Sequence, residues 1–142
     1  IDILHSIFII ILVYVSYFFI GILINIFFDY SKTVPNNIGF LKNKMSILYI
    51  LFVFINPWFE ELIIRGYIIT EVKKLTQNIY LAVFISVFLQ SIAHLYQGFI
   101  PVLYLTSMFL IFSLYYVKTK KIVPVILAHL FFDVVAMFVY AV

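Results

Sequence analysis

Five apolar segments alternate with short polar stretches along this chain. A helix needs about 20 apolar residues to cross the hydrocarbon core of a bilayer, with a range near 17–25. The apolar segments cover residues 3–28, 45–69, 79–96, 99–117 and 122–142. The polar connections between them cover residues 29–44, 70–78, 97–98 and 118–121. The pattern predicts an all-α, polytopic transmembrane helix bundle with about five spans in this fragment.

A proline interrupts the second segment, directly after Asn56. Proline has no backbone N–H, and it disfavours the helical conformation in the residue before it. We therefore expect the helix to kink or restart here. In that case Asn56 would cap the new turn and Pro57 would occupy its first position.

The composition excludes a soluble globular domain. Hydrophobic residues make up 66% of the 142 residues and charged residues only 11%, whereas soluble domains average about 25% charged residues. The length fits one membrane domain over residues 1–142, with a core at about 45–142 and an additional N-terminal span at 1–28. The chain starts at Ile1 without a methionine or a charged signal-peptide region, so we interpret it as truncated.

Charge and cysteine content narrow the possible partners. The chain has no cysteine, which excludes disulfides, a thiol nucleophile and a thiolate metal site within it. The net charge of +3 lies in loop lysines, which suits anionic lipid headgroups better than nucleic acid. The loops at 70–78 and 118–121 carry five lysines, against three in the loop at 29–44, which favours a cytoplasmic location for the first two.

Three charged residues lie inside the second apolar segment, namely Glu60, Glu61 and Arg65. A charge at the centre of a bilayer costs roughly 2.5–3.5 kcal/mol on insertion scales, so such groups usually face the protein interior and are functional candidates. Glu61 and Arg65 are four residues apart, so they share a helix face and can pair. Glu60 points about 100° away from Glu61 and has no cation nearby in sequence. The alternative is that all three residues only tie helices together.

Two later segments contribute further ionisable residues, His94 in the third and His129 with Asp133 in the fifth. His129 and Asp133 are four residues apart, so the carboxylate can orient the imidazole ring. Alternatively, His94 lies at the membrane interface and the other two form a polar clamp between helices. No role is assigned to His5. The tyrosines in the segments, among them Tyr14, Tyr17 and Tyr104, are expected to be interface or packing residues.

These three groups together, Glu60-Glu61-x-x-x-Arg65, then His94, then His129-x-x-x-Asp133, resemble the CPBP family of intramembrane proteases, the CaaX-protease and bacteriocin-processing family. The resemblance covers about Asn56 to Asp133. Two positions depart from the family pattern: Gln90 stands where a phenylalanine is expected four residues before His94, and Ile64 precedes Arg65-Gly66 in place of phenylalanine.

The resemblance implies a role for each candidate residue. Glu60 would be the general base that activates water, and His94 would share that water. His129 and Asp133 would stabilise the oxyanion, Asp133 either as a protonated donor or by orienting His129. Glu61 and Arg65 would be the supporting pair. The implied protein is a multi-pass endopeptidase of the bacterial plasma membrane, with membrane lipid as its surroundings and a membrane-associated, prenylated or other peptide substrate.

The family is often classed with the metalloproteases, so a metal has to be considered. Glu60, His94 and His129 could supply three ligands to Zn²⁺ and leave a fourth position open. The chain has no HExxH motif, and a glutamate-activated water needs no metal. We therefore favour a mechanism without a cofactor and keep zinc as the alternative.

Three other functions remain open at this point. A non-catalytic membrane immunity or scaffold protein could retain the motif for structure, and Gln90 is the residue that best supports this alternative. Buried carboxylates and histidines also form proton or ion pathways. Haem could be held between His94 and His129, although the adjacent glutamates argue against it.

Overall fold

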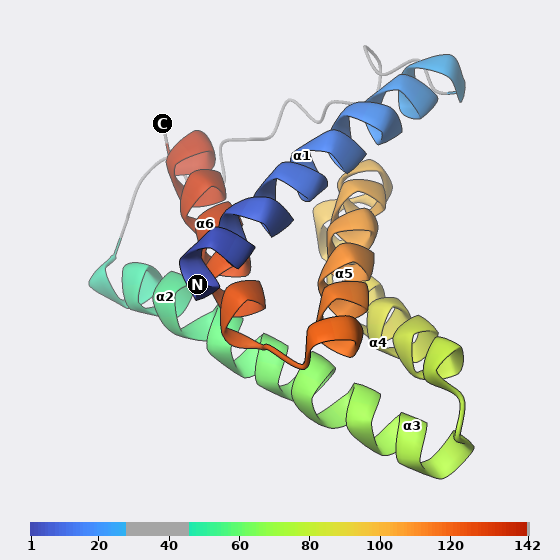
Figure 1. Cartoon of the computed structure of the whole chain (residues 1–142). Coiled ribbons are helices and arrows are strands. Elements are labelled where there is room, and N and C mark those ends of the chain that lie inside the picture. Colours follow the sequence, from blue (N-terminus) through green and yellow to red (C-terminus); the bar gives the residue numbers. More distant parts are fainter. Residues whose placement is uncertain (28–45, 142) are drawn as a thin grey trace.

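The computed structural model describes residues 1–27 and 46–141 (Figure 1). These residues form helices joined by short connections and contain no strand, which confirms the all-α fold class for the described part. The elements are α1 (Asp2–Phe27), α2 (Ile47–Glu61), η3 (Leu62–Ile68), α3 (Ile69–Thr76), α4 (Ile79–Ala93), η4 (Leu95–Gln97), α5 (Phe99–Thr119) and α6 (Val123–Ala141).

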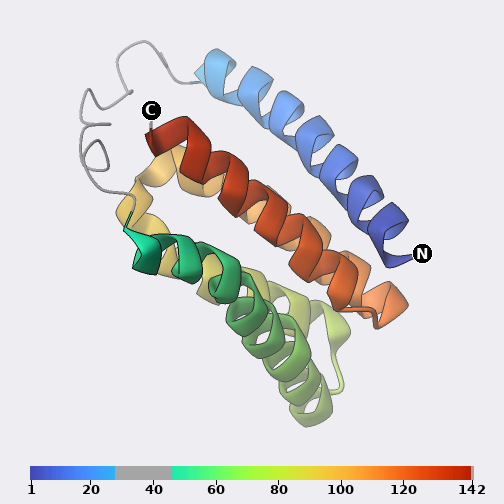
Figure 2. The same ribbon diagram turned by 90° about the vertical axis from the view of Figure 1, so that its left-hand side faces the viewer.

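The helices pack as a bundle in which α5 and α6 lie at the centre. Helix α1 packs against both α5 and α6, α4 packs against α5, and α2 packs against α6. The continuous rod of α2, η3 and α3 runs along one side of the bundle, where α3 also contacts α4 (Figures 1 and 2). The expected loop at 29–44 lies outside the described residues.

The interior of the bundle is an apolar cluster contributed by four helices. Its buried members come from α1, α4, α5 and α6, and they are Ile9, Val13, Val83, Val87, Met108, Phe109, Phe112, Val125 and Ala128. Burying an apolar side chain of this size contributes roughly 1.5–3 kcal/mol in water, but lipid is itself apolar, so packing contributes most here. The cluster therefore fixes helix positions mainly by shape.

The outer surface of the bundle is also apolar, as a lipid-facing surface must be. Large hydrophobic side chains are exposed on all the long helices, for example Phe18, Phe52, Phe84 and Phe138. Among the described residues, three helical stretches are long and apolar enough to cross a membrane: Asp2–Phe27, Ile47–Thr76 and Phe99–Thr119. The helices at Ile79–Ala93 and Val123–Val139 are apolar but shorter.

The expected restart of the helix at Asn56-Pro57, with Asn56 as its cap, is wrong. Helix α2 continues through Pro57, which is buried within it. The cap lies ten residues earlier, where the Ser46 side chain accepts a hydrogen bond from the Tyr49 N–H at 3.2 Å. The side chain of Asn56 instead contacts Glu60. Proline is tolerated in membrane helices because neighbouring elements compensate for the missing hydrogen bond, and here the helix continues without a second cap.

The second apolar segment also extends further than expected. It passes through a π-helical stretch, Leu62–Ile68, and continues as α3 to Thr76, so the predicted loop at 70–78 is mostly helix. Gln77 ends the helix in the left-handed conformation at φ 55°. Asn78 then caps α4, since its side chain accepts from the N–H groups of Tyr80 and Leu81. The turn therefore consists of two polar residues with opposite capping roles.

The third segment ends earlier than expected, at Ala93 instead of residue 96. His94 caps the end of α4, a 3₁₀ turn follows at Leu95–Gln97, and Gly98 with φ 102° begins α5. A positive φ of this size suits glycine, because other residues would be strained there. The short turn places His94 at a helix end, where its ring is not confined to a helix face.

Helix α1 is joined to the bundle by polar contacts as well as by packing. Asp2 Oδ1 lies 3.7 Å from Lys121 Nζ, so the start of α1 lies beside the α5–α6 connection. His5, for which the sequence suggested no role, contacts the Tyr115 hydroxyl at 2.5 Å through Nδ1. Further along, Ser16 and Ser107 contact each other through their hydroxyls at 3.1 Å.

The close approach of α1 and α5 at Gly21 gives a first test of the fold. A Cβ atom at this position would lie 3.3 Å from the Tyr104 hydroxyl. We therefore expect Gly21→Leu to push the two helices apart and to cost about 1–3 kcal/mol, as overpacking usually does. The measurement is the thermal unfolding midpoint in detergent. Ile22→Leu, at the neighbouring exposed position, is the control, and equal midpoints for both variants would show that the helices do not approach closely.

Candidate active site

The predicted pair of Glu61 and Arg65 is present and fully buried. Arg65 Nη1 donates to Glu61 Oε1 at 3.2 Å, and both side chains have 0% exposure. The pair spans the junction of α2 and the π-helical stretch. The prediction from the i, i+4 spacing is confirmed.

Arg65 also contacts two other helices. Its Nη1 donates to Gln90 Oε1 on α4, and its Nη2 donates to the Phe109 carbonyl oxygen on α5 at 3.2 Å. The guanidinium lies 5.4 Å from the ring centroid of Phe109 and 5.6 Å from that of Phe112. Planar, weakly hydrated guanidinium groups suit such stacked and forked contacts. A single buried cation thus joins α2, α4 and α5.

The Glu61 carboxylate in turn holds His129. His129 Nδ1 lies 2.7 Å from Glu61 Oε1, and because a carboxylate accepts, the nitrogen donates. His129 is 2% exposed, and its ring also contacts Phe112 at a centroid distance of 5.9 Å. The bond fixes which side of the ring faces Glu61 and directs Nε2 to the opposite side.

Glu60, for which the sequence predicted no cation nearby in the chain, accepts hydrogen bonds from two side-chain amides. Asn56 Nδ2 donates to its Oε1 at 2.6 Å, and Gln90 Nε2 donates to its Oε2 at 2.9 Å. Two neutral donors thus fix the orientation of the Glu60 carboxylate. The Glu60 side chain as a whole keeps 25% exposure, so it is not fully enclosed.

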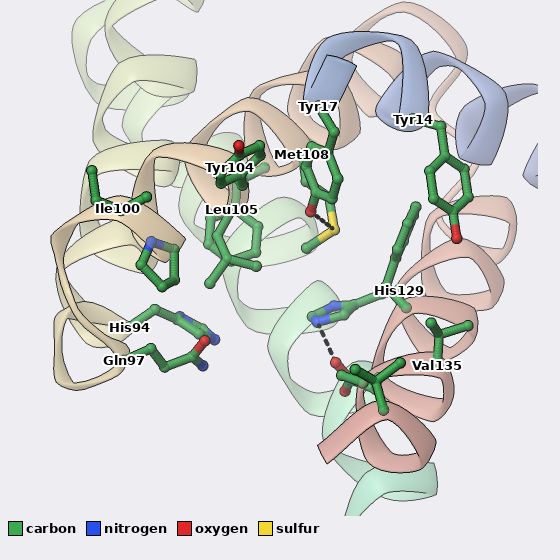
Figure 3. Close-up of a pocket in the computed structure, with 16 residues that line it drawn as sticks. Tyr14, Tyr17, His94, Gln97, Ile100, Tyr104, Leu105, Met108, His129 and Val135 are labelled. Atoms are coloured by element: carbon green, nitrogen blue, oxygen red, sulfur yellow. Dashed lines mark hydrogen bonds and ion pairs between the residues drawn. The ribbon is translucent and has the colours of Figure 1, made fainter. Parts of the chain in front are cut away.

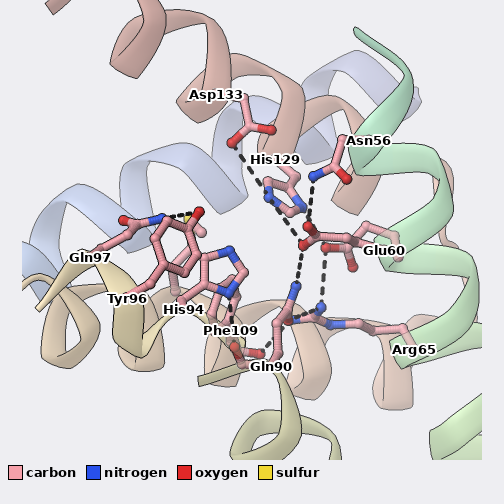
Figure 4. A network of polar contacts seen from close by, with 12 residues as sticks. Asn56, Glu60, Arg65, Gln90, His94, Tyr96, Gln97, Phe109, His129 and Asp133 are labelled. Carbon is pink, nitrogen blue, oxygen red and sulfur yellow. Dashed lines mark hydrogen bonds and ion pairs between the residues drawn. The ribbon is translucent and has the colours of Figure 1, made fainter. Parts of the chain in front are cut away.

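His129 Nε2 lies between two carboxylates (Figure 4). It is 3.9 Å from Glu60 Oε2 and 3.6 Å from Asp133 Oδ1. The shared face of His129 and Asp133 that the spacing predicted is confirmed. Both separations are longer than a direct hydrogen bond. The structure therefore brings Glu60 from α2 and the pair from α6 together at one point.

His94 lies at the end of α4, opposite Glu60 (Figure 4). Its Nδ1 is 2.9 Å from the Gln90 carbonyl oxygen. A carbonyl only accepts, so Nδ1 carries the hydrogen, and neutral His94 has Nε2 as a free acceptor. An aromatic ring does lie beside it, as in the family pattern, but it is Phe109 from α5 at a centroid distance of 5.1 Å.

A cavity of about 440 Å³ opens beside these residues (Figure 3). His94, His129 and Asp133 line one part of it, and Tyr14 and Tyr17 of α1 line another. Glu60 does not form part of the cavity wall, but its Oε2 lies 3.9 Å from Nε2 of His129, which does. Together with Tyr104, the two α1 tyrosines are thus cavity residues, where the sequence suggested interface or packing positions.

Sequence reasoning missed the contacts of three residues at this site. Asn56 was expected to cap a helix, but its position four residues before Glu60 also allows a side-chain contact on one helix face. Gln90 stood out only as a departure from a pattern. The Phe109 carbonyl has no sequence signal, because every residue carries one.

The positions of Glu60, His94 and His129 can also be compared with what a zinc site requires. Within residues 1–27 and 46–141, no three His, Cys, Asp or Glu side chains are arranged to hold a metal ion. The Nδ1 atoms of His94 and His129 are engaged by oxygen acceptors, which leaves Nε2 of each ring as the nitrogen that could bind a metal, and both Glu60 oxygens accept amide hydrogen bonds. Zinc binding by Glu60, His94 and His129 therefore stays a prediction.

Comparison with known proteins defines the class. A family model described as type II CAAX prenyl endopeptidase Rce1-like matches residues 42–135, about two thirds of the chain, and includes all six candidate residues. The chain belongs to this family. Membership supports CAAX-type intramembrane proteolysis as the activity at family level and, with the three long apolar helices, makes the chain an integral membrane protein. No curated protein and no solved structure matches the chain.

The buried ion pair provides the second test. Arg65→Ala leaves the Glu61 carboxylate buried without its cation, and breaking a buried pair in this way costs on the order of 3–5 kcal/mol. We expect a lower unfolding midpoint in detergent and a lower yield of folded protein. Lys74→Ala, which removes an exposed partner of Glu71, is the control. An unchanged midpoint for Arg65→Ala would contradict the buried pair.

Proposed function

We propose that this protein is an intramembrane endopeptidase in which Glu60 activates water for attack on a peptide bond. The observation that carries the proposal is the convergence of Glu60, His129 and Asp133 from two helices beside a cavity that His94 also lines. Four ionisable side chains inside an apolar bundle raise the free energy of the folded protein, and such groups usually mark a functional site. Membership in a family of CAAX-type endopeptidases supports peptide-bond hydrolysis as the reaction.

The first step uses Glu60 and His94. A water molecule beside the Glu60 carboxylate gives up a proton to it, and the hydroxide attacks the carbonyl carbon of the peptide bond. The free Nε2 of His94 can accept a hydrogen bond from the same water and orient it. The proton on Glu60 then passes to the leaving nitrogen as the C–N bond breaks.

The oxyanion formed in this attack needs a donor. His129 is the candidate, because its Nε2 faces the site while Nδ1 is engaged by Glu61. Nε2 can donate only when it is protonated, and the carboxylates of Glu61 and Asp133 are then placed to balance the charge of the imidazolium. Asp133 acts in this scheme by orienting the ring. Donors aligned in advance of the reaction typically contribute several kcal/mol to such a transition state.

The substrate in this proposal is a membrane-associated peptide, prenylated or not. The cavity combines tyrosine hydroxyls with aliphatic and aromatic walls, which suits a peptide segment carrying an apolar group. Lipid surrounds the exposed apolar faces, and the plasma membrane of a bacterium is the proposed location. A non-catalytic immunity or scaffold role has no comparable observation in its favour.

Substitution of the base tests the proposal directly. Glu60→Gln keeps the size of the side chain and removes its ability to take a proton, so cleavage of membrane peptides by purified protein should fall by about 10²–10⁴-fold. Glu71→Gln, at a partly exposed glutamate of α3, is the matched control and should retain activity. Equal cleavage rates for wild type and Glu60→Gln would refute the role of Glu60.

The mechanism without a metal is tested separately. A metalloprotease loses activity when its cation is removed and regains it with zinc, because the ligands must bind the cation for catalysis. We expect cleavage to persist in phenanthroline and elemental analysis to show no stoichiometric metal. One zinc per active chain, with activity lost and restored in step with it, would instead establish a metalloprotease.

A further inference from the structure

Gln90 occupies the centre of the polar network (Figure 4). It is 2% exposed, on α4, between the guanidinium of Arg65 and the carboxylate of Glu60. A buried amide is costly unless its donors and acceptor find partners. Here the Gln90 oxygen contacts Arg65 and the Gln90 nitrogen contacts Glu60, so the position of the amide affects the orientation of both side chains.

The chemistry of the neighbours fixes which way the amide points. Arginine has donors only, so the Gln90 atom beside it must be the oxygen. The NH₂ group then faces Glu60 and donates to Oε2 at 2.9 Å. The reversed amide would place NH₂ against a cation and oxygen against a carboxylate. Arg65 thus sets the direction in which Gln90 supports Glu60.

The hydrogen bond from Gln90 to Glu60 differs from the one that Asn56 donates to Glu60. Asn56 lies on the same helix as Glu60, so its hydrogen bond orients the carboxylate only relative to α2. Gln90 lies on α4, and its backbone carbonyl also accepts from His94 Nδ1 at 2.9 Å. The same residue therefore contacts Glu60 through its side chain and His94 through its main chain.

The position of Gln90 is itself held firmly. Arg65, which contacts it, is anchored by Glu61 on α2 and by the Phe109 carbonyl on α5. A chain of contacts consequently runs from His129 through Glu61, Arg65 and Gln90 to Glu60. Each residue of this chain contacts at least one other, so the side chains restrict one another's freedom.

We propose that Gln90 is a positioning residue that fixes the Glu60 carboxylate relative to His94, so that both can contact one water molecule. This inference rests on the proposed function and deepens it. A phenylalanine, which the family pattern places here, could neither accept from Arg65 nor donate to Glu60. The chain has instead a phenylalanine beside His94 from α5, Phe109, and uses position 90 for the amide.

Two variants separate the two contacts of the amide. Gln90→Met keeps the length of the side chain and removes both hydrogen bonds. Gln90→Glu keeps an acceptor for Arg65 but replaces the donor to Glu60 with an oxygen of like charge. Ser91→Ala is the control, because it removes the 2.8 Å hydroxyl contact with Thr106 between α4 and α5 without touching Glu60. Unfolding midpoints, kcat and KM are measured for each in detergent with a membrane peptide.

The positioning role predicts a specific pattern. Misplacing a catalytic group by about 1 Å can cost about 100-fold in rate, so both Gln90 variants should lose at least about tenfold in kcat with KM little changed. Gln90→Met should also lower the unfolding midpoint, because it deprives Arg65 of an acceptor. Ser91→Ala should keep its kcat.

The contrary outcomes are distinct from one another. A Gln90→Glu variant with wild-type kcat would refute the positioning role, and so would kcat losses that follow the unfolding midpoints across all three variants. If Gln90→Met does not fold, Gln90→Glu decides alone. If the wild-type protein shows no cleavage that depends on Glu60, the proposed function fails and the positioning role with it. If wild type cleaves and Gln90→Glu is equally active, the positioning role alone fails.

Discussion

The buried contact between Arg65 and Glu61 is the interaction on which the polar interior depends. Moving a charge out of water costs several kcal/mol even after relaxation, and that cost is offset only when the partners and their remaining hydrogen bonds are well placed. Arg65 meets this requirement in part, because Nη1 and Nη2 find acceptors on α2, α4 and α5, and Glu61 Oε1 extends the contacts to α6 through His129. Among the described residues, Arg65 Nε and Glu61 Oε2 are buried without a hydrogen-bond partner. One ion pair therefore connects four helices and adds specific polar contacts to the packing of the apolar cluster.

Much of the fold could be predicted from the sequence because the spans follow from hydropathy alone. The wrong predictions concern where helices begin and end, which depends on backbone hydrogen bonding. Pro57 suggested a break, but a helix in lipid has no water to satisfy the freed groups, so the chain remains helical through it. Thr70 to Thr76 suggested a loop by their polarity, yet they extend the helix, with the cationic Lys73 and Lys74 near the negative end of its dipole.

At the candidate site, residue spacing predicted contacts within one helix and not contacts between helices. The pairs Glu61–Arg65 and His129–Asp133 follow from a separation of four residues. The contact of Gln90 with both Arg65 and Glu60 depends on how α4 packs against η3 and α3, which no local pattern specifies. Phe109 contributes a carbonyl and a ring from α5, and neither is distinguishable in sequence from the other apolar residues of that helix.

The π-helical stretch at Leu62–Ile68 has a consequence for the geometry of the whole rod. An α-helix presents one stripe to its neighbours, but here the half before the stretch packs against α6 and the half after it packs against α4. The wider turns, with their i to i+5 hydrogen bonds, change the azimuth of the second half relative to the first without exposing backbone groups to lipid. An insertion or deletion between Glu61 and Ile69 would rotate one half about the common axis. The number of residues in this stretch is therefore constrained as well as their identity.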